Sequence, residues 1–592
     1  MRVVSDSMSA LARSTEINCD TRAANEDCIN GGSRTRTKYG YDALNRPISA
    51  SYKIGSTTDQ SISYSYDSGG NGKGRLTGAS DANHSISWSY DALGRVSGRG
   101  QTVSGTTLSV GYAYTNGDLV TVTTPSGQTV KYSYANHRVN GITVNSTPLL
   151  SAVAHEPFGP VRDWTWGNST TEVRLHNTDG NPSLTSGVES ITLGYDDALR
   201  IANMTNSANT ALSWNYDYDS LDRLTSASKA GSSVNWGYDA SGNRLQQPGG
   251  SAGAPLSVPG TYTYNDRGRL SSATMGSVSS NYTYNGLGQM IEKNVGGVLT
   301  LLMYDESGHL LGEYTGAGVL IQETLWLGDI PVATLRANGS SVSVNYVHAD
   351  QLGTPRMVTR SSDNAILWRW DADPFGSTIP NENPQNLGTF VYNLRFPGQY
   401  YIAETGLFYN HHRDYDPRTG RYVESDPIGL GGGNYSTYGY ADENPVSFSD
   451  PMGLYVKLCS RWVGNPKNKA TWQINPYRHD YLDVSGQFIG FYSARGANPA
   501  WGQGVVAGQN EQDGGRCSSL CSDNKFDAYV LAAAQEIGAP TYCAIASAEF
   551  GIPGLAAVAG GARNCQSWAR DVIAKAKQNY LAHEKCPTCF KN

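Results

Sequence analysis

The sequence predicts a mainly β protein in which an array of β-hairpins precedes a small α+β domain. One tyrosine-aspartate unit recurs along most of the chain, as in "YGYDALNRPISASY" (39–52) and "WNYDYDSLDRLTSAS" (214–228). The 592 residues include 67 Gly and 37 Tyr and only 16% are charged, which is typical of short strands joined by tight turns. Seven of the nine cysteines follow residue 455, where the repeats stop and alanine-rich helical patterns begin.

Each repeat predicts one β-hairpin. It alternates aromatic and polar residues, turns at Asp-x-x-Gly or a near equivalent, and alternates again. One hairpin cannot bury its own face, so we expect the copies to stack into a continuous β-sheet structure. The tyrosines are then packing residues of the sheet. They recur at steps of 20 to 26 residues where copies are consecutive, at Tyr41, Tyr66, Tyr90, Tyr216, Tyr238, Tyr264, Tyr284 and Tyr304.

Charge and hydropathy exclude several classes of protein. The net charge is −7, but residues 455–592 hold 14 Lys and Arg against 10 Asp and Glu, so the tail carries +4 and the body −11. This split is too mild to predict a nucleic-acid partner. No run reaches the roughly 18 apolar residues of a membrane span. The first twenty residues lack the apolar segment of a signal peptide, so export would need a specialised system.

Residues 395–454 carry the most specific pattern, which includes "YNHHRDYDPRTGRYVESDPIGL" (409–430). This block resembles the C-terminal signature of the Rhs core, and the repeats resemble the YD repeats of Rhs polymorphic toxins and toxin-complex C subunits. The resemblance implies a hollow β-cocoon around a C-terminal effector. The expected divisions are a non-repeat segment (1–35), the YD-repeat β-array (36–395), a core-associated self-cleavage region (396–454) and a toxin domain (455–592).

Two Asp-Pro-x-Gly-Leu motifs, at 426–430 and 450–454, bracket a Gly/Tyr-rich segment. Taken alone, they fit either two Asp-Pro turns or two carboxylates that share a proton and activate water. The resemblance to Rhs proteins favours the second interpretation and implies self-cleavage of the Leu454–Tyr455 bond. It assigns the principal catalytic aspartate to Asp426.

The partners of Asp426 are less sharply indicated. The second aspartate is Asp450 or, as an alternative, Asp442. Arg421 is the candidate arginine. Rhs proteins commonly have an arginine directly before the first motif's aspartate, where this chain has Ser425, and this departure leaves the role of Arg421 open.

The C-terminal domain predicts strands followed by helices. A hairpin is expected from "HDYLDV" (479–484) and "QFIGFYSA" (487–494) around a Ser-Gly turn. Helical patterns follow at 525–538, 552–561 and 564–584.

Cys565 lies in the first turn of the last predicted helix. A thiol there is a buried packing group or a nucleophile, because the positive end of the helix dipole favours the thiolate. His583 would lie about 27 Å away on the same helix, which leaves His479 as the candidate base. In a hairpin with a two-residue turn, Tyr492 faces His479 and would orient its imidazole. Alternatives for this third group are Asp480 and Asp483.

The pieces "RHDYLDV" and "RNCQSWARDVI" resemble the circularly permuted papain-like superfamily, which includes amidases, peptidases and acyltransferases. A second cysteine set is Cys517, Cys521, Cys586 and Cys589. These four residues fit short structural disulfides or, as an alternative, a zinc site. We expect no cofactor if they are disulfides.

The sequence therefore predicts a polymorphic toxin of interbacterial competition whose β-shell releases a Cys/His hydrolase or acyltransferase. Its expected partners are a cognate immunity protein, secretion machinery or a missing N-terminal delivery region, and a macromolecular substrate in the target cell. The alternatives are a membrane-active or pore-forming domain built on 541–561, a nuclease, and a cell-surface adhesin. Glycines interrupt 541–561, and we see no acidic metal cluster typical of nucleases.

Overall fold

The computed structural model describes two compact units, Met1–Glu424 with Tyr438–Pro451, and Ser425–Thr437 with Met452–Asn592. Only the backbone is described for the residues before Thr37, for Ile54 and Thr57, and for the residues after Leu454. The three predicted helices of the C-terminal domain lie outside the described residues, which contain no α-helix. The described residues are 14–18, 29–30, 33–54, 57–156, 160–177, 180–239, 242–245, 260–427, 436–454, 458–462, 478–484, 487–493, 501–508, 516–518 and 541–543.

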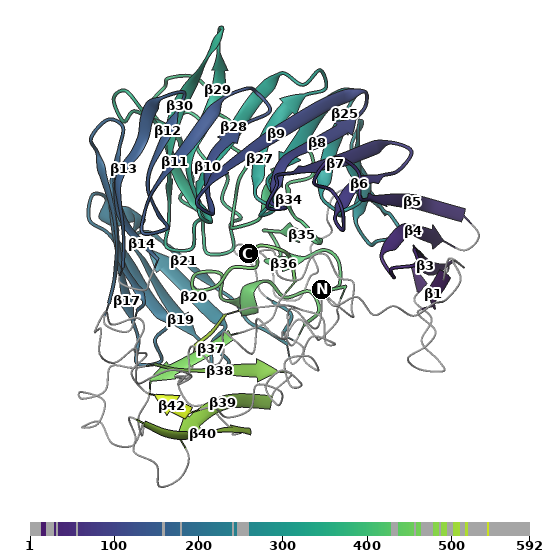
Figure 1. Ribbon diagram of the computed structural model, residues 1–592. Helices are drawn as coiled ribbons and strands as arrows, with labels where there is room; N and C mark the ends of the chain where they lie inside the picture. The colour runs from purple at the N-terminus through teal and green to yellow at the C-terminus, as the bar shows by residue number, and fades with distance from the viewer. Residues whose placement is uncertain are drawn as a thin grey trace. The chain divides into compact units, whose positions relative to one another are not determined.

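The described part of the first unit is built from three antiparallel sheets (Figure 1). The repeat pattern predicts stacked antiparallel hairpins, which these sheets contain, but not their division into three. The first sheet contains β1 (Ser14–Asn18), β2 (Ile29–Asn30), β3 (Ser33–Tyr41), β4 (Pro47–Ile54), β5 (Thr57–Tyr66), β6 (Leu76–Ser80), β7 (His84–Tyr90), β8 (Val96–Val103), β9 (Thr106–Thr115), β10 (Asp118–Thr123), β11 (Thr129–Ala135), β12 (Arg138–Val144), β13 (Thr147–His155), β14 (Val161–Trp166), β15 (Thr171–His176), β16 (Pro182–Ser186), β17 (Ser190–Tyr195), β18 (Ile201–Asn206), β19 (Trp214–Tyr218), β20 (Leu224–Lys229) and β21 (Ser232–Asn235).

The second sheet contains β22 (Thr261–Tyr264), β23 (Leu270–Met275), β24 (Val278–Tyr284), β25 (Met290–Val295), β26 (Val298–Tyr304), β27 (Leu310–Thr315), β28 (Leu320–Leu327), β29 (Ile330–Asn338), β30 (Ser341–Ala349), β31 (Pro355–Arg360) and β32 (Ile366–Arg369). The third contains β33 (Tyr400–Ile402), β34 (Leu407–Asn410), β35 (Arg413–Asp416) and β36 (Arg421–Tyr422). Short 3₁₀ helices lie at Thr210–Leu212 and Ala441–Glu443. From β3 to β21, and within the other two sheets, each strand pairs with the next along the chain.

The aspartate of the repeated unit fixes the turn of each hairpin. In the turn after β17, Asp196 Oδ1 accepts hydrogen bonds from the N–H groups of Ala198 and Arg200, each at 2.9 Å. Its Oδ2 accepts a third from Arg200 Nε at 2.7 Å. The same contacts to the N–H groups two and four residues later recur at Asp42, Asp91, Asp219, Asn265, Asn285, Asp305 and Asp350. The side chain therefore replaces missing backbone partners in the turn.

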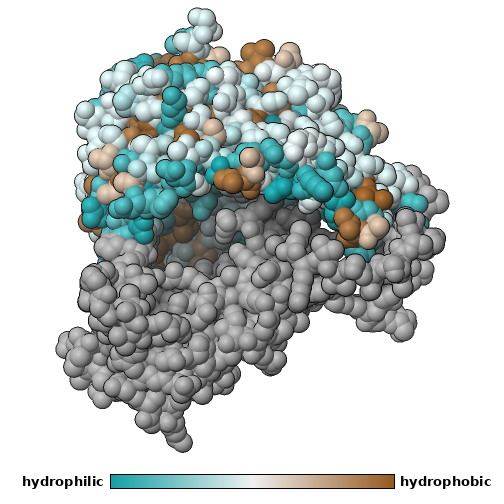
Figure 2. All heavy atoms as spheres, viewed as in Figure 1, coloured by the Kyte–Doolittle hydropathy of each residue, from teal (hydrophilic) through white to brown (hydrophobic). Residues whose placement is uncertain are grey.

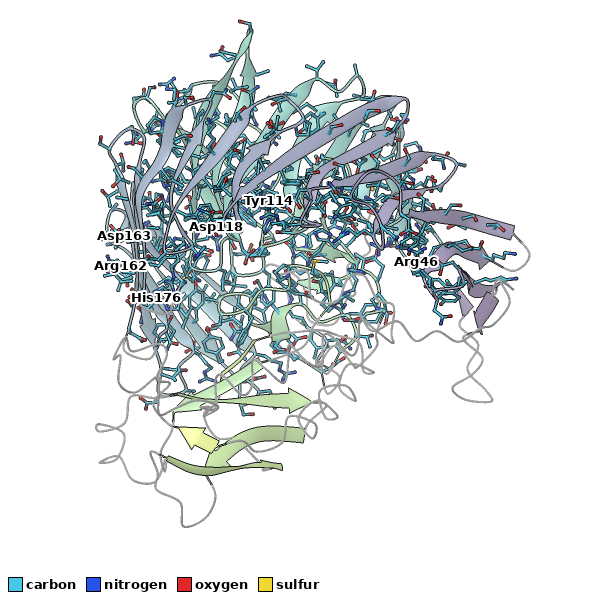
Figure 3. The ribbon with its side chains drawn as sticks, viewed as in Figure 1. Arg46, Tyr114, Asp118, Arg162, Asp163 and His176 are labelled. Carbon is cyan, nitrogen blue, oxygen red and sulfur yellow. The ribbon has the colours of Figure 1, made fainter. Side chains whose placement is uncertain are left out.

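The arginine of the same turn links it to the following hairpin. The Arg200 guanidinium lies 4.9 Å from the centre of the Tyr218 ring, and the Tyr218 hydroxyl donates to the carbonyl oxygen of Ile201 at 2.7 Å. Equivalent links join Arg95 to Tyr114, and Arg46 to Tyr66. Figure 3 labels one residue of each link, Tyr114 and Arg46. Burial raises the pKa of Tyr66 to about 12, so its hydroxyl remains a donor at neutral pH.

Three apolar clusters hold the described part of the first unit together. One joins the two large sheets and includes Trp164 and Trp166 from β14 as well as Leu301 and Met303 from β26. Another packs β17–β20 against Phe375 and Val446. Polar side chains also cross between the large sheets. Gln101 Nε2, for example, donates to the carbonyl oxygen of Leu302 at 2.8 Å.

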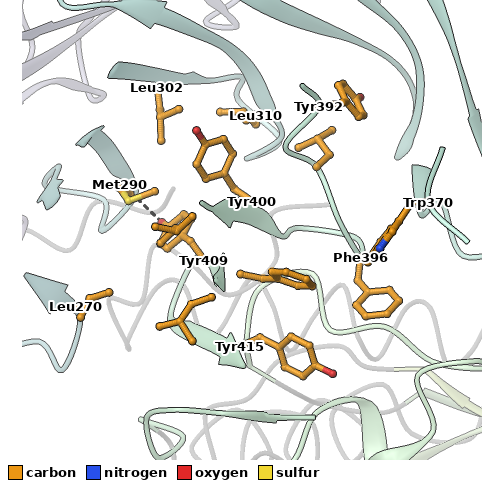
Figure 4. Close-up of a cluster of buried hydrophobic side chains, with 14 of the residues drawn as sticks. Leu270, Met290, Leu302, Leu310, Trp370, Tyr392, Phe396, Tyr400, Tyr409 and Tyr415 are labelled. Atoms are coloured by element: carbon orange, nitrogen blue, oxygen red, sulfur yellow. Dashed lines mark hydrogen bonds between the residues drawn. The ribbon is translucent and has the colours of Figure 1, made fainter. Parts of the chain in front are cut away.

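The third cluster places the small sheet β33–β36 against strands of the second sheet (Figure 4). The Tyr409 hydroxyl accepts a hydrogen bond from the Met290 backbone N–H at 2.9 Å, which ties β34 to β25. Phe396 and Tyr415 pack beside Trp370 in the same cluster. The strands β33–β36, which lie in the first half of the Rhs-like block, are therefore fixed by the core of the repeat array.

The outside of the first unit carries isolated apolar residues among hydrophilic ones (Figure 2). Among the large apolar residues of the described positions, the most exposed are Ile379 at 82%, Leu93 at 76% and Val298 at 70%. Single exposed apolar residues of this kind are ordinary for a protein surface. Among the described residues, no helix is both long and apolar enough to cross a membrane.

The second unit contains a separate antiparallel sheet in the order β41-β37-β38-β39-β40-β42. Its strands are β37 (Leu458–Trp462), β38 (Arg478–Val484), β39 (Gln487–Ser493), β40 (Trp501–Gly508), β41 (Arg516–Ser518) and β42 (Thr541–Cys543). β38 and β39 form the predicted hairpin, with Val484 opposite Gln487 across a two-residue turn.

Candidate active site

Asp450, in the second Asp-Pro motif, is the centre of a buried polar cluster in the first unit. Its Oδ2 accepts a hydrogen bond from the Tyr422 hydroxyl at 2.9 Å and lies 3.3 Å from Arg413 Nη2. Asn410 Nδ2 donates to the Asp450 carbonyl oxygen and to the Tyr422 hydroxyl oxygen, each at 2.7 Å. The Asp450 and Arg413 side chains are each 2% exposed. An ion pair removed from water in this way needs additional hydrogen bonds, and here they are present.

The small sheet positions these partners. Asn410 ends β34 and Arg413 begins β35, and the two residues are directly opposite one another across the turn at His411 and His412. Tyr422 lies on the neighbouring strand β36, where it pairs with Tyr415 of β35. Three consecutive strands thereby bring Asn410 and Tyr422 together, although they are 12 residues apart along the chain. Asp450 contacts both residues from the later segment Tyr438–Pro451.

The cluster favours a charged Asp450 and a neutral Tyr422. Burial and the Asp450 carboxylate raise the pKa of Tyr422 well above its usual value, because a phenolate there would lie beside another negative charge. The Arg413 guanidinium lies 3.7 Å from the centre of the Tyr422 ring. It faces both the ring and the carboxylate.

Asp414 and Glu424 form a second contact between acidic residues in this part of the first unit. The Asp414 backbone N–H donates to Glu424 Oε2 at 2.7 Å. Asp414 is buried, and Glu424 is half-buried with its Oε1 atom out of contact with solvent. Burial raises the pKa of Asp414 to about 7, although a hydrogen bond with Glu424 and the positive charge of Arg269 act to lower it. Burial and Asp414 together raise the pKa of Glu424 well above its usual value. The pair therefore holds a proton near neutral pH, since two adjacent buried carboxylates cannot both ionise readily.

The remaining predicted residues of this region have different surroundings. Asp426 belongs to the second unit, is 7% exposed, and donates its backbone N–H to the Thr437 carbonyl oxygen at 2.7 Å. Arg421 donates to Asn243 Oδ1 at 2.9 Å, in a repeat turn of the first unit. Asp442 is half-buried in the 3₁₀ helix Ala441–Glu443, with a φ of 53°. The arginine beside Asp450 is thus Arg413, which the sequence analysis did not select.

The backbone of the second unit places two of the toxin-domain candidates on adjacent strands. His479 lies on β38 opposite Arg461 of β37, and Tyr492 lies on β39 opposite Val505 of β40. The β38–β39 pairing ends at Tyr481 opposite Gly490, and its register, extended by two residues, would place His479 opposite Tyr492. Cys565 lies outside the described residues.

The alternative third members of that site, Asp480 and Asp483, occupy the same strand β38 as His479. Of the four cysteines considered for zinc or short disulfides, the described residues include Cys517, on β41. Cys521, Cys586 and Cys589 lie outside them. Among the described residues, no group of three or more His, Cys, Asp or Glu side chains is arranged to hold a metal ion.

Known proteins resemble parts of this chain. Residues 185–322 match the family model of the teneurin YD-shell. The uncharacterized protein YibJ of Escherichia coli is 42% identical over 111 residues, which are 19% of this chain and 45% of YibJ. The toxin protein Tse5 of Pseudomonas aeruginosa is 35% identical over 129 residues, 22% of this chain and 9% of Tse5. The probable deoxyribonuclease RhsA of Dickeya dadantii is 34% identical over 140 residues, 23% of this chain and 9% of RhsA.

Among solved structures, the crystal structure of TcdB2-TccC3-Cdc42 superposes with a TM-score of 0.59 and 15% identity, over 72% of this chain and 27% of that one. The chain thus spans less than half the length of these curated relatives and of this structure. The class that the fold defines is a YD-repeat β-shell. The relatives of parts of the chain include a toxin and a probable deoxyribonuclease.

The Asp414–Glu424 pair predicts a pH-dependent stability of the first unit. The folded pair keeps a proton up to about pH 7, whereas an unfolded Asp or Glu releases it near pH 4. The folded state therefore binds more protons in this window, so the pair's contribution to stability falls as the pH rises from about 4 to above 7. Glu424→Gln removes one titrating group and keeps an oxygen for the Asp414 N–H.

The measurement is the melting temperature of wild type and Glu424→Gln between pH 4 and pH 8. We expect the variant to gain stability relative to wild type as the pH rises. Asp197→Asn, which neutralises an exposed carboxyl of a repeat turn, serves as the control and should not change the slope. Parallel profiles for wild type and Glu424→Gln would show that the pair does not hold a proton near neutral pH.

Proposed function

We propose that the chain is the shell of an Rhs-type polymorphic toxin that cleaves its own Leu454–Tyr455 bond and frees a C-terminal effector. The observation that carries the proposal is the buried Asp450 carboxylate, held by Arg413 and Tyr422 and located four residues before that bond. Buried, charge-paired carboxylates with specific hydrogen bonds are candidates for catalysis. The likeness to Rhs-type relatives supports the same function.

The proposed reaction uses Asp450 and Asp426 as an aspartyl pair. One carboxylate takes a proton from a water molecule while the oxygen of that water attacks the Leu454 carbonyl carbon. The other, protonated, carboxyl gives its proton to the Tyr455 nitrogen as the C–N bond breaks. Arg413 keeps Asp450 ionised by its positive charge, and Tyr422 fixes the direction of the carboxylate.

Self-cleavage predicts a C-terminal fragment of about 15 kDa that begins at Tyr455, from roughly 110 Da per residue over about 140 residues. Asp426→Asn and Asp450→Asn should abolish the fragment, because an amide cannot exchange the proton. Intact mass spectrometry of the purified chain measures both. Full cleavage in either variant would reject the aspartyl mechanism.

The two arginines offer a matched comparison in the same experiment. Arg413→Gln removes the charge beside Asp450 and should slow cleavage by roughly tenfold or more, whereas Arg421→Gln removes a contact to Asn243 and should leave the rate nearly unchanged. Melting temperatures report whether each variant folds. Equal rates for the two variants would assign no role to Arg413.

The released effector is proposed to be a cysteine hydrolase or acyltransferase, with Cys565 as nucleophile and His479 as base. Support comes from the β38–β39 hairpin, whose register, extended by two residues beyond Tyr481–Gly490, would place His479 opposite Tyr492. A cognate immunity protein, a delivery system without a signal peptide and a macromolecular substrate in the target cell belong to the same proposal. The second candidate is a nucleic-acid-directed effector, which the names of RhsA and the double-stranded DNA deaminase toxin A of Burkholderia cenocepacia favour.

Expression of residues 455–592 in a bacterium without the immunity protein separates these candidates. Cys565→Ser and His479→Ala should each abolish toxicity, because loss of a nucleophile or its base costs orders of magnitude in rate. Circular dichroism and melting temperature should stay unchanged. Undiminished toxicity of Cys565→Ser, together with damage to cellular DNA, would favour the nucleic-acid-directed effector.

A further inference from the structure

Two cysteines far apart in the sequence are directly opposite one another in the sheet of the second unit. β37 and β41 are antiparallel neighbours, with β41 at the edge of the sheet. Their register pairs Leu458 with Ser518, Cys459 with Cys517, and Ser460 with Arg516. The sequence analysis grouped Cys517 with the nearby Cys521, because only spacing along the chain was visible.

Backbone geometry at such a position suits a disulfide. Opposite residues of an antiparallel pair have Cα atoms about 4.5 or 5.5 Å apart, depending on the hydrogen-bonding position, and both values lie within the roughly 4.4–6.8 Å range of disulfides. Residues directly opposite one another also share one face of the sheet. The strand register therefore satisfies the backbone requirements for linking Cys459 to Cys517 without moving either strand.

We propose that Cys459 and Cys517 form a disulfide that fastens the edge strand β41 to β37. A disulfide oxidant such as oxidised glutathione supplies the electron acceptor. One cysteine thiolate attacks it, forms a mixed disulfide and releases one reduced glutathione. The second cysteine thiolate then attacks the mixed disulfide, forms the Cys459–Cys517 bond and releases a second reduced glutathione. The two cysteines lose two electrons, and their protons end on the two glutathione thiols.

Whether this bond forms would depend on whether the surroundings are oxidising or reducing. It closes a loop that contains β38, β39 and β40, so it restricts the unfolded chain over all of them. It forms in oxidising surroundings and stays open in a reducing cytosol. A disulfide at Cys517 also removes that residue from any zinc site in the oxidised protein, and it does not involve Cys565. The inference goes beyond the proposed function, because it requires neither self-cleavage nor catalysis by Cys565.

The test maps the cysteines of the full chain after incubation with oxidised glutathione and alkylation of free thiols by iodoacetamide. Trypsin cuts after Lys457, Arg461, Arg516 and Lys525, which yields the peptides 458–461 and 517–525. Mass spectrometry without reductant should find these two peptides joined, and reduction should separate them. The longer peptide also contains Cys521, so two variants identify the partner of Cys459.

Cys521→Ser should keep the link, whereas Cys517→Ser should abolish it. In the oxidised wild type, the melting temperature of the second unit should exceed that of the reduced protein by about 10 °C. Alkylated Cys459 in the oxidised wild type would overturn the proposal. A link that persists in Cys517→Ser would also overturn it, because Cys459 would then be joined to Cys521.

Discussion

The aspartate-centred turn is the interaction on which the first unit depends. One carboxylate satisfies two backbone N–H groups and holds an arginine, and that arginine lies over the tyrosine of the next hairpin. The tyrosine hydroxyl returns to a carbonyl oxygen beside the arginine. A turn that carries this arginine is thus connected to its successor, so the pattern Tyr-Asp-x-x-x-Arg encodes a stack as well as a hairpin.

The candidate active site inherits its rigidity from this stack. Tyr409 of β34 is tied to Met290 in the second sheet, and the strands β34–β36 hold Asn410, Arg413 and Tyr422 around Asp450. Buried charges at Asp450 and a shared proton at Asp414 are costly in an apolar core. Packing against the repeat array offsets that cost, which connects the shell to the chemistry proposed for it.

The hairpins, their turns and the Asp-Pro motifs could be predicted from sequence, because alternation and turn residues act over a few neighbours. The arginine that pairs with Asp450 could not be predicted in this way. Sequence proximity favoured Arg421, yet the tight turn after Asn410 makes Arg413 the neighbour, and a hairpin prediction for "YNHHRDYD" was the available signal. The opposition of Cys459 and Cys517 depends on a long-range strand register, which spacing alone does not specify.

Hydrogen exchange in Asp196→Ala and Asp197→Ala tests the link between repeats most directly. Both residues lie in the same turn, but Asp196 accepts three hydrogen bonds, whereas Asp197 is exposed and makes no side-chain hydrogen bond that is seen among the described residues. We predict that Asp196→Ala speeds amide exchange in its own turn and in β19, which carries Tyr218, and that Asp197→Ala changes neither. Faster exchange confined to the Asp196 turn, with β19 unchanged, would contradict the account.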